Sequence, residues 1–289
     1  MPRLAYVDGQ IVPLAAASVP VEDRGLQFAD SIYEVCAVLN GRLLDWPLHR
    51  ARLERNLNAL RIAPPMAGAA LGLIARRVIA ANRATEALLY IQVTRGTAKR
   101  DHSFSASARP TLIMTVRPFD FAQRVAQQAK GVAVIGVADQ RWGRCDIKST
   151  GLLANVLAKQ DARAAGAFEA WLVRDDGTVT EGGSTNAWIV DAAGAIVTHP
   201  QSPRILPGVM RGAVIEAAVA AGITVVERPF TLSEAHAAAE AFITSTTVPV
   251  LPVVAIDGES VGGGVPGPVT ARLTTAIWAR IAAQTGYRP

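Results

Sequence analysis

Several features of common protein classes are missing from this sequence of 289 residues. Its two cysteines, Cys36 and Cys145, lie far apart and outside any CxxC or Cys/His pattern, so we expect neither a disulfide framework nor a metal site. No run approaches the roughly 18 consecutive apolar residues of a membrane span, and the first residues lack the apolar core of a secretory signal. These absences predict a cytoplasmic protein with no membrane partner.

Dense blocks of basic residues are also absent. The formal net charge is +5, but Lys and Arg alternate with Asp and Glu along the chain. A nucleic-acid-binding tail would concentrate its basic residues, so we expect no nucleic-acid partner.

Lysine itself is scarce. Of the 29 basic residues only four are lysines, at positions 99, 130, 148 and 159, which leaves 29 − 4 = 25 arginines. Arginine replaces lysine in most surface roles but cannot form an imine. A lysine kept in an apolar setting is therefore a candidate for covalent chemistry.

Strand and helix patterns occur in separate blocks, which is typical of an α+β fold. Alternating apolar runs flank Asp8-Gly9 and Asn40-Gly41, two dipeptides that favour tight hairpin turns. Two helical periods and two further strand patterns follow, and the pattern then breaks near residue 120. We therefore expect a smaller N-terminal α+β domain over residues 1–120 and a larger domain over residues 121–289.

The second half contains the lysine with the most unusual surroundings. Lys148 lies between the apolar, β-rich run GVAVIGVADQ and the helical period LLANVLAKQDARAAGAF. A strand-to-helix junction is a position where folds often carry reactive side chains, so Lys148 is the first candidate.

Further along, Thr231 and Glu234 have the spacing of a capping box, which predicts the start of another helix.

A lysine that forms a Schiff base with pyridoxal phosphate needs a carboxylate for the pyridine nitrogen and a cup for the phosphate. Glu181 precedes a strand pattern, Gly208 precedes a helix pattern, and hydroxyl residues gather between Thr244 and Val248. Helix starts attract anions, although most bind none. Taken alone, Glu181 would be interpreted as a solvated turn residue; it becomes a candidate because the other groups occur with it.

Five ordered motifs resemble the fold-type IV, pyridoxal-phosphate-dependent aminotransferases: HRARL, RCDIKSTGLLANVLAKQ, EGGSTNAW, ILPGVMR and TSTTVPVLPV. That group includes branched-chain aminotransferases, D-amino acid aminotransferases and aminodeoxychorismate lyases. The similarity runs from about Tyr6 to Asp257, and FADSIYEV and RGTAKRDH resemble the D-amino acid enzymes in particular. The resemblance implies a two-domain architecture, with a smaller α/β sandwich domain and a larger β-barrel-like domain surrounded by helices.

The resemblance also implies roles for matching residues. Lys148 matches the Schiff-base lysine, Glu181 the acid that pairs with the pyridine nitrogen, and Arg52 the phosphate-binding arginine. Arg50 is a neighbour in sequence but points about 200° away around a helix, since residues advance roughly 100° each. The other positions that match cofactor-binding residues are Val209, Met210 and Thr246.

At the substrate end, Tyr33, Arg100 and His102 match the carboxylate-binding residues of the D-amino acid enzymes, and Thr247 is a further substrate-binding position. Each of the first three can donate a hydrogen bond to a carboxylate, and arginine adds a fixed charge. Without the resemblance, KRDH would be interpreted as a solvated loop. In that family the Arg-x-His pair reaches in from the other subunit, which implies a homodimer with a shared active site.

The predicted function is pyridoxal-phosphate-dependent transamination between a D-amino acid and a 2-oxo acid, of the D-alanine/2-oxoglutarate type. The alternatives are a branched-chain L-amino acid aminotransferase, an aminodeoxychorismate lyase, and a non-catalytic dimer that binds a phosphate ligand. The Arg100-x-His102 pair argues against the first, and a colourless protein would indicate the last. His199 and His236 match nothing in the pattern and are expected at the surface.

Overall fold

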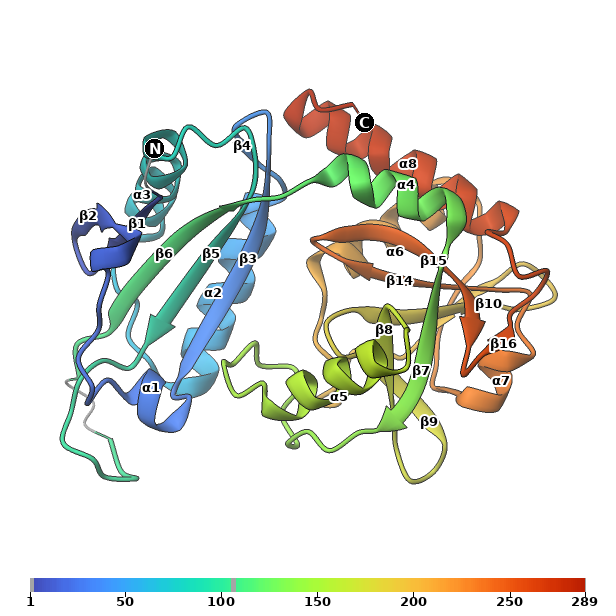
Figure 1. Cartoon of the computed structure of the whole chain (residues 1–289), viewed down its shortest axis with the longest axis horizontal. Helices are drawn as coiled ribbons and strands as arrows, with labels where there is room; N and C mark the ends of the chain where they lie inside the picture. Colours follow the sequence, from blue (N-terminus) through green and yellow to red (C-terminus); the bar gives the residue numbers. More distant parts are fainter. Residues whose placement is uncertain (1–2, 105–107, 289) are drawn as a thin grey trace. The chain divides into compact units, whose positions relative to one another are not determined.

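The computed structural model describes residues 3–104 and 108–288, and this part of the chain divides into two compact units (Figure 1). The first unit contains the chain up to Asp120, together with Ile147–Gly151 and Gln284–Tyr287. The second unit contains Phe121–Asp146, Leu152–Ala283 and Arg288. Lys148 therefore folds with the first unit, although it lies in the second half of the sequence.

The first unit is built on a six-stranded antiparallel sheet in the order β2-β1-β6-β5-β3-β4. Its strands are β1 (Leu4–Val7), β2 (Gln10–Pro13), β3 (Ser31–Leu39), β4 (Arg42–Leu43), β5 (Glu86–Thr94) and β6 (Thr111–Pro118). The predicted hairpin turns at Asp8-Gly9 and Asn40-Gly41 are confirmed, and all four residues have positive φ. Left-handed backbone at both central residues matches the twist of two paired strands.

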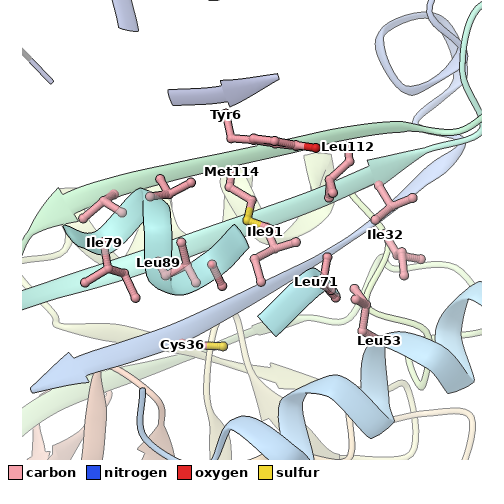
Figure 2. Close-up of a cluster of buried hydrophobic side chains, with 14 of the residues drawn as sticks. Tyr6, Ile32, Cys36, Leu53, Leu71, Ile79, Leu89, Ile91, Leu112 and Met114 are labelled. Atoms are coloured by element: carbon pink, nitrogen blue, oxygen red, sulfur yellow. The ribbon is translucent and has the colours of Figure 1, made fainter. Parts of the chain in front are cut away.

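Two helices supply much of the core of this unit. Helix α2 (Trp46–Leu60) contributes Leu53, and α3 (Gly68–Ala81) contributes Leu71 and Ile79. These side chains pack with strand residues such as Leu89 and Met114 (Figure 2). The helical spacing of the apolar residues turns one face of each helix toward the buried cluster.

A short helix, α1 (Arg24–Phe28), was not predicted from the sequence. The side chain of Asp23 caps it by accepting a hydrogen bond from Gly25 N at 2.8 Å, and the helix ends at Phe28, followed by the C-cap Ala29, which has a φ of 53°. A single turn is too short to show helical periodicity in a sequence. A 3-10 turn at Leu14–Ala16 completes the helical elements of this unit.

The second unit contains a ten-stranded sheet in which β12-β11-β10-β14-β15-β7-β8-β9-β13 are neighbours in that order and β16 pairs with β15. The strands are β7 (Val132–Ala138), β8 (Glu169–Val173), β9 (Thr178–Gly182), β10 (Asn186–Val190), β11 (Ile196–Thr198), β12 (Val225–Glu227), β13 (Phe230–Thr231), β14 (Glu240–Ser245), β15 (Val248–Ile256) and β16 (Glu259–Ser260). β7 pairs in parallel with both β8 and β15. Within the described chain β12 and β13 are the ends of this order, so the barrel-like domain is a mixed sheet without the ring of pairings that closes a barrel.

The helices of the second unit are α4 (Phe121–Lys130), α5 (Leu153–Ala164), α6 (Val209–Ala220), α7 (Leu232–His236) and α8 (Pro268–Thr285). The predicted capping box is confirmed, because Thr231 Oγ1 accepts from Glu234 N at 3.1 Å and Glu234 Oε2 accepts from Thr231 N at 2.8 Å. Trp171 and Phe230 pack edge to face in the core, with ring centroids 6.0 Å apart. Across residues 3–104 and 108–288, no helix is long and apolar enough to cross a membrane.

Candidate active site

Lys148 lies in an irregular segment alongside the start of β3. Tyr33 N donates to Lys148 O at 3.0 Å, and Ile32 forms a bridge with Ser149. β7 ends at Ala138 and α5 begins at Leu153, so the lysine lies within a long connection and not directly at a strand-to-helix corner. Pairing with β3 fixes the backbone on which the amine is carried.

The half-buried Lys148 side chain contacts Tyr33, one of the predicted substrate-binding residues. Lys148 Nζ donates to Tyr33 Oη at 3.3 Å and lies 4.3 Å from the ring centroid. Tyr33 in turn stacks on Tyr90 with ring centroids 5.6 Å apart, and burial, followed by the effect of Tyr33, raises the pKa of Tyr90 to about 12. The structure therefore brings the Lys148 amine into contact with the Tyr33 phenol, whose ring is held by stacking on Tyr90.

Arg52 lies on α2 in a buried cluster with Glu34 of β3. Arg52 Nε donates to Glu34 Oε1 at 2.8 Å and Arg52 Nη2 to Oε2 at 2.8 Å, while His49 Nδ1 lies 2.7 Å from Oε2. Arg50 instead is 42% exposed in its side chain and pairs with Glu54 at 3.9 Å, so the helix geometry correctly separates the two arginines. The sequence analysis did not identify Glu34.

The charges in this cluster are strongly coupled. Burial alone would raise the pKa of Glu34, but the Arg52 charge and the hydrogen bonds from Arg52 and His49 lower it to about 2. The bidentate contact fixes the plane of the Arg52 guanidinium, because two parallel N–H donors must meet two carboxylate oxygens. Glu34 therefore orients Arg52.

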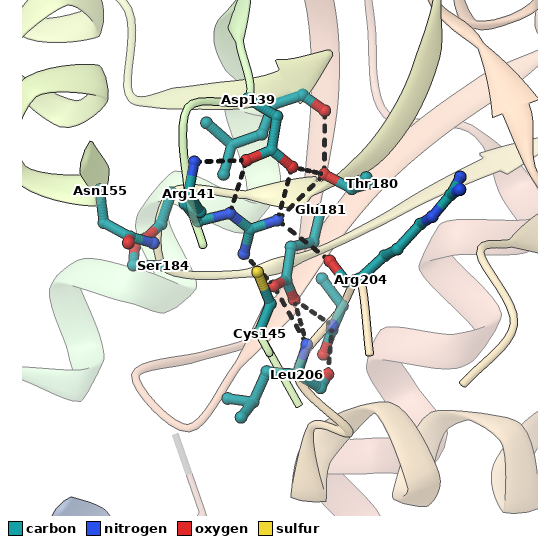
Figure 3. A network of polar contacts seen from close by, with 12 residues as sticks. Asp139, Arg141, Cys145, Asn155, Thr180, Glu181, Ser184, Arg204 and Leu206 are labelled. Carbon is teal, nitrogen blue, oxygen red and sulfur yellow. Dashed lines mark hydrogen bonds and ion pairs between the residues drawn. The ribbon is translucent and has the colours of Figure 1, made fainter. Parts of the chain in front are cut away.

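Glu181 lies on β9 in the second unit and is 4% exposed, which rules out a solvated turn residue. Arg141 Nη1 donates to its Oε1, and Leu206 N lies 3.1 and 3.0 Å from the two oxygens (Figure 3). Asn186 Nδ2 donates to Oε2 at 3.0 Å. Every one of these partners is a donor, which is the environment of an ionised carboxylate.

Arg141 was missed by the sequence analysis, although it lies seven residues before Lys148. Its Nε and Nη2 bind the two oxygens of Asp139 at 2.9 Å each, and Nη2 also donates to Thr180 Oγ1 at 3.1 Å. Burial would raise the pKa of Asp139, but hydrogen bonds from Arg141 and its charge keep it below its ordinary value. Arg144 resembles Arg141 in sequence context but is exposed and pairs with Asp146, so only the fold separates them.

Asn186 connects Glu181 to the start of α6. Its Nδ2 also donates to Leu206 O at 2.9 Å, and a side chain at Gly208 would clash with its Oδ1. Gly208 is the N-cap of α6, which begins at Val209, so the glycine lets the helix start close to Asn186. The first N–H groups of a helix have no acceptor within it and suit an anion.

A second predicted phosphate loop lies near the same strands. Asn186 of β10 pairs with Thr244 of β14, and Thr246-Thr247 forms the two-residue turn between β14 and β15. The turn is fixed by Ser245, whose Oγ lies 3.1 Å from Thr247 Oγ1 and accepts from Val248 N at 3.2 Å. The second unit therefore combines the carboxylate, the helix start and the hydroxyl turn around two neighbouring strands.

Arg100 and His102 are exposed, in the first unit. The guanidinium carbon of Arg100 lies 4.6 Å from the ring centroid of Phe28, and the ring centroid of His102 lies 5.6 Å from that of Phe28. The structure thus brings both residues of the predicted pair to one aromatic ring.

The expectation that His199 lies at the surface is wrong. Its exposed fraction is 3%, and its carbonyl accepts from Arg211 Nη2 at 2.9 Å. Arg211, in the first turn of α6, is itself 1% exposed and also pairs with Glu227 at 2.6 Å. His199 directly follows the end of β11 at Thr198, where its carbonyl is held by the buried Arg211.

The Glu34 cluster generates a prediction about acid stability. The pKa of the Glu34 carboxyl lies below the ordinary 4.5. Its contribution to the free energy of unfolding, about 3 kcal/mol at most, is therefore present above pH 4.5 and is lost as the pH falls toward 2. We expect the difference in unfolding free energy between wild type and Glu34→Gln to shrink over that range, as measured by denaturant titration. Glu54→Gln, which alters an exposed pair, should have little effect at any pH. A Glu34→Gln difference that does not vary with pH would contradict this assignment.

Comparisons with known proteins identify the family of this chain. Residues 31–256 match the family described as Amino-transferase class IV. The D-alanine aminotransferase of Bacillus licheniformis is 39% identical over 278 residues, covering 96% of this chain and 97% of that protein, and the D-alanine aminotransferase of Staphylococcus aureus (strain MSSA476) is 36% identical over 93% and 94%.

Solved structures of branched-chain amino acid aminotransferases share the fold. The Escherichia coli enzyme superimposes with a TM-score of 0.91 at 24% identity, covering 99% of this chain and 96% of that one. The enzyme from Thermoproteus uzoniensis, solved with norvaline, gives a TM-score of 0.85 at 26% identity, covering 99% and 97%. This chain is a member of the amino-transferase class IV family and has the fold-type IV architecture.

Proposed function

We propose that this class IV aminotransferase uses pyridoxal 5'-phosphate to transfer an amino group between a D-amino acid and a 2-oxo acid, with D-alanine and 2-oxoglutarate as the type of pair. The observation that carries the proposal is the 39% identity to a D-alanine aminotransferase over almost the full length of both chains. The Arg100 and His102 side chains at Phe28 support it, because a guanidinium and an imidazole suit a substrate carboxylate.

The residues present fit the cofactor. When bound, pyridoxal phosphate supplies an aldehyde that reacts with amines and a ring that withdraws electrons from the substrate carbon. Lys148 offers an amine, Glu181 a buried carboxylate for the ring nitrogen, and Arg52 a cation for the phosphate. The other proposed cofactor-binding groups are the helix start at Val209 and Met210 and the turn residue Thr246.

Each of these side chains would perform a defined task. Lys148 would hold the cofactor and afterwards move a proton at Nζ, because its amine can accept and return one. Tyr33 Oη, which accepts a hydrogen bond from Lys148 Nζ, would orient that amine. Glu181 would hold a proton at the ring nitrogen, and Arg141 would keep the Glu181 carboxylate in place.

The carboxylate-binding residues would decide which enantiomer reacts. One lysine works from one side, so the substrate α-hydrogen must point toward Lys148. Arg100 and His102, reaching in from the other subunit of the proposed dimer, would anchor the carboxylate together with Tyr33 and Thr247, so that a D-amino acid presents its hydrogen correctly. A branched-chain L-amino acid would need a different anchor.

The first test compares two amino donors on the purified holoenzyme. D-alanine should remove the visible absorbance of the lysine-bound cofactor, whereas L-leucine should leave it unchanged, as followed by stopped-flow spectroscopy. Lys148→Ala should lose that absorbance and lower turnover at least about a hundredfold, because the proton-transfer group is gone. Lys130→Ala, which removes an exposed lysine at the end of α4, is the matched control.

Three other results of these experiments would each indicate a different function. Reaction with L-leucine alone would replace the proposal with a branched-chain aminotransferase. Release of pyruvate from aminodeoxychorismate would indicate a lyase. A protein that stays colourless with added cofactor would indicate a non-catalytic phosphate-ligand binder.

We further propose that the protein is a homodimer whose subunits share the active site. Helix α5 supports this, because Leu153, Val156 and Leu157 are 73%, 58% and 53% exposed. Positions three and four apart lie on the same face of a helix, so the three side chains form one apolar stripe. Such a stripe is stabilised when another protein surface covers it.

The dimer is tested by placing a charge on this stripe. Leu157→Glu should shift the protein toward monomer in sedimentation velocity, since burying an unpaired carboxylate is costly. Val219→Glu alters a residue of α6 that is 65% exposed and should leave the assembly unchanged. A Leu157→Glu protein that sediments like wild type would refute the involvement of this stripe.

A further inference from the structure

We propose that Arg24 and Phe28 are positioning residues that set the orientation of Arg100 and His102, and thereby the strength of substrate carboxylate binding. The inference rests on the proposed function, in which Arg100 and His102 bind that carboxylate. It concerns four side chains of the first unit, and α1, which carries two of them, was not foreseen from the sequence.

Arg24 organises the backbone that carries the pair. It is 3% exposed, and its Nη1 donates to Asp101 O at 2.6 Å and to Ser103 O at 3.2 Å. Its Nη2 lies 3.5 Å from His102 O. One buried guanidinium therefore contacts three consecutive carbonyl groups, which fixes the path of the chain around His102.

Phe28 contacts both side chains of the pair. The guanidinium carbons of Arg24 and Arg100 lie 4.8 and 4.6 Å from the centroid of its ring, and the ring centroid of His102 lies 5.6 Å away. Arg24 and Phe28 are four residues apart on α1, so they project from the same face of the helix. Cation–π contacts restrict an otherwise exposed arginine.

The same loop is attached at a second point. The guanidinium carbon of Arg95 lies 3.6 Å from the ring centroid of Phe104, and Asp30 accepts from both Arg95 Nε at 2.7 Å and Arg24 Nε at 2.9 Å. Burial would raise the pKa of Asp30, but the hydrogen bonds and charges of the two arginines keep it below its ordinary value. Asp30 thus connects the supports on either side of the Arg100–His102 segment.

Exposed, flexible side chains bind a carboxylate weakly, because binding must first order them. A fixed backbone and an aromatic support remove part of this cost before substrate arrives. Arg24 and Phe28 should therefore act on substrate binding and leave the chemical step unaffected. A role in folding alone would instead change stability without separating KM from kcat.

The test uses the holoenzyme variants Phe28→Leu and Arg24→Lys, with steady-state kinetics on D-alanine and equilibrium binding of propionate, a carboxylate without an amine. We expect KM and the propionate Kd to rise about five-fold or more, with kcat and the cofactor absorbance little changed. Leu26→Ala, at a residue of α1 that is 66% exposed, is the matched control. Thermal unfolding shows whether each variant retains its fold.

Adding Phe28→Leu to the double variant Arg100→Ala/His102→Ala isolates the mechanism. If Phe28 acts through the pair, the added substitution should cause no further loss of propionate binding. An equal further loss would overturn the inference, as would Phe28→Leu and Arg24→Lys variants with unchanged KM and Kd. If Arg100→Ala itself leaves both values unchanged, the carboxylate assignment of the proposed function fails, and the inference fails with it.

Discussion

The carboxylate of Glu181 is the group around which the buried polar network of the second unit is built. It is buried and accepts hydrogen bonds from Arg141, the amide of Asn186 and the backbone of Leu206. A buried carboxylate without such partners would be too costly to keep ionised. The same contacts set the position of the α6 start, because Asn186 binds both Glu181 and Leu206 O next to Gly208. The carboxylate and the start of α6, the proposed phosphate-binding position, are therefore parts of one hydrogen-bonded arrangement.

In each unit a buried ion pair fixes the orientation of one charged side chain, a cation in the first unit and an anion in the second. In the first, Glu34 fixes Arg52, whose proposed task is to hold a phosphate; in the second, Arg141 fixes Glu181, whose proposed task is to hold a proton on a ring nitrogen. In each case the working group is more than nine-tenths buried and cannot rely on solvent for orientation. Bidentate pairing supplies the orientation, for Arg52 directly and for Arg141 through Asp139. Arg24, bound by Asp30 and three carbonyl groups, follows the same pattern at the proposed substrate end.

The sequence predicted the hairpins, the capping box and the residue types of the candidate site, because these depend on local patterns. Arg50 and Arg52 could be told apart, since helical geometry alone separates their directions. Arg141 and Arg144 could not, because both lie in an irregular segment where no periodicity indicates which one is buried. Glu34 and Arg24 were missed for a related reason: their partners lie far away in sequence. The position of Lys148 in the first unit could not be predicted either, because it depends on the pairing of its segment with β3, which is distant in sequence.

The proposed function depends most on Glu181 acting as an ionised carboxylate that holds a proton on the cofactor's ring nitrogen. Nitrogen NMR of the holoenzyme, reconstituted with cofactor labelled at that atom, reports the protonation directly. We expect a protonated ring nitrogen in wild type near neutral pH and an unprotonated one in Glu181→Gln. An unprotonated nitrogen in wild type, or the same signal in both proteins, would contradict the role assigned to Glu181 and to the Arg141 contact that holds it.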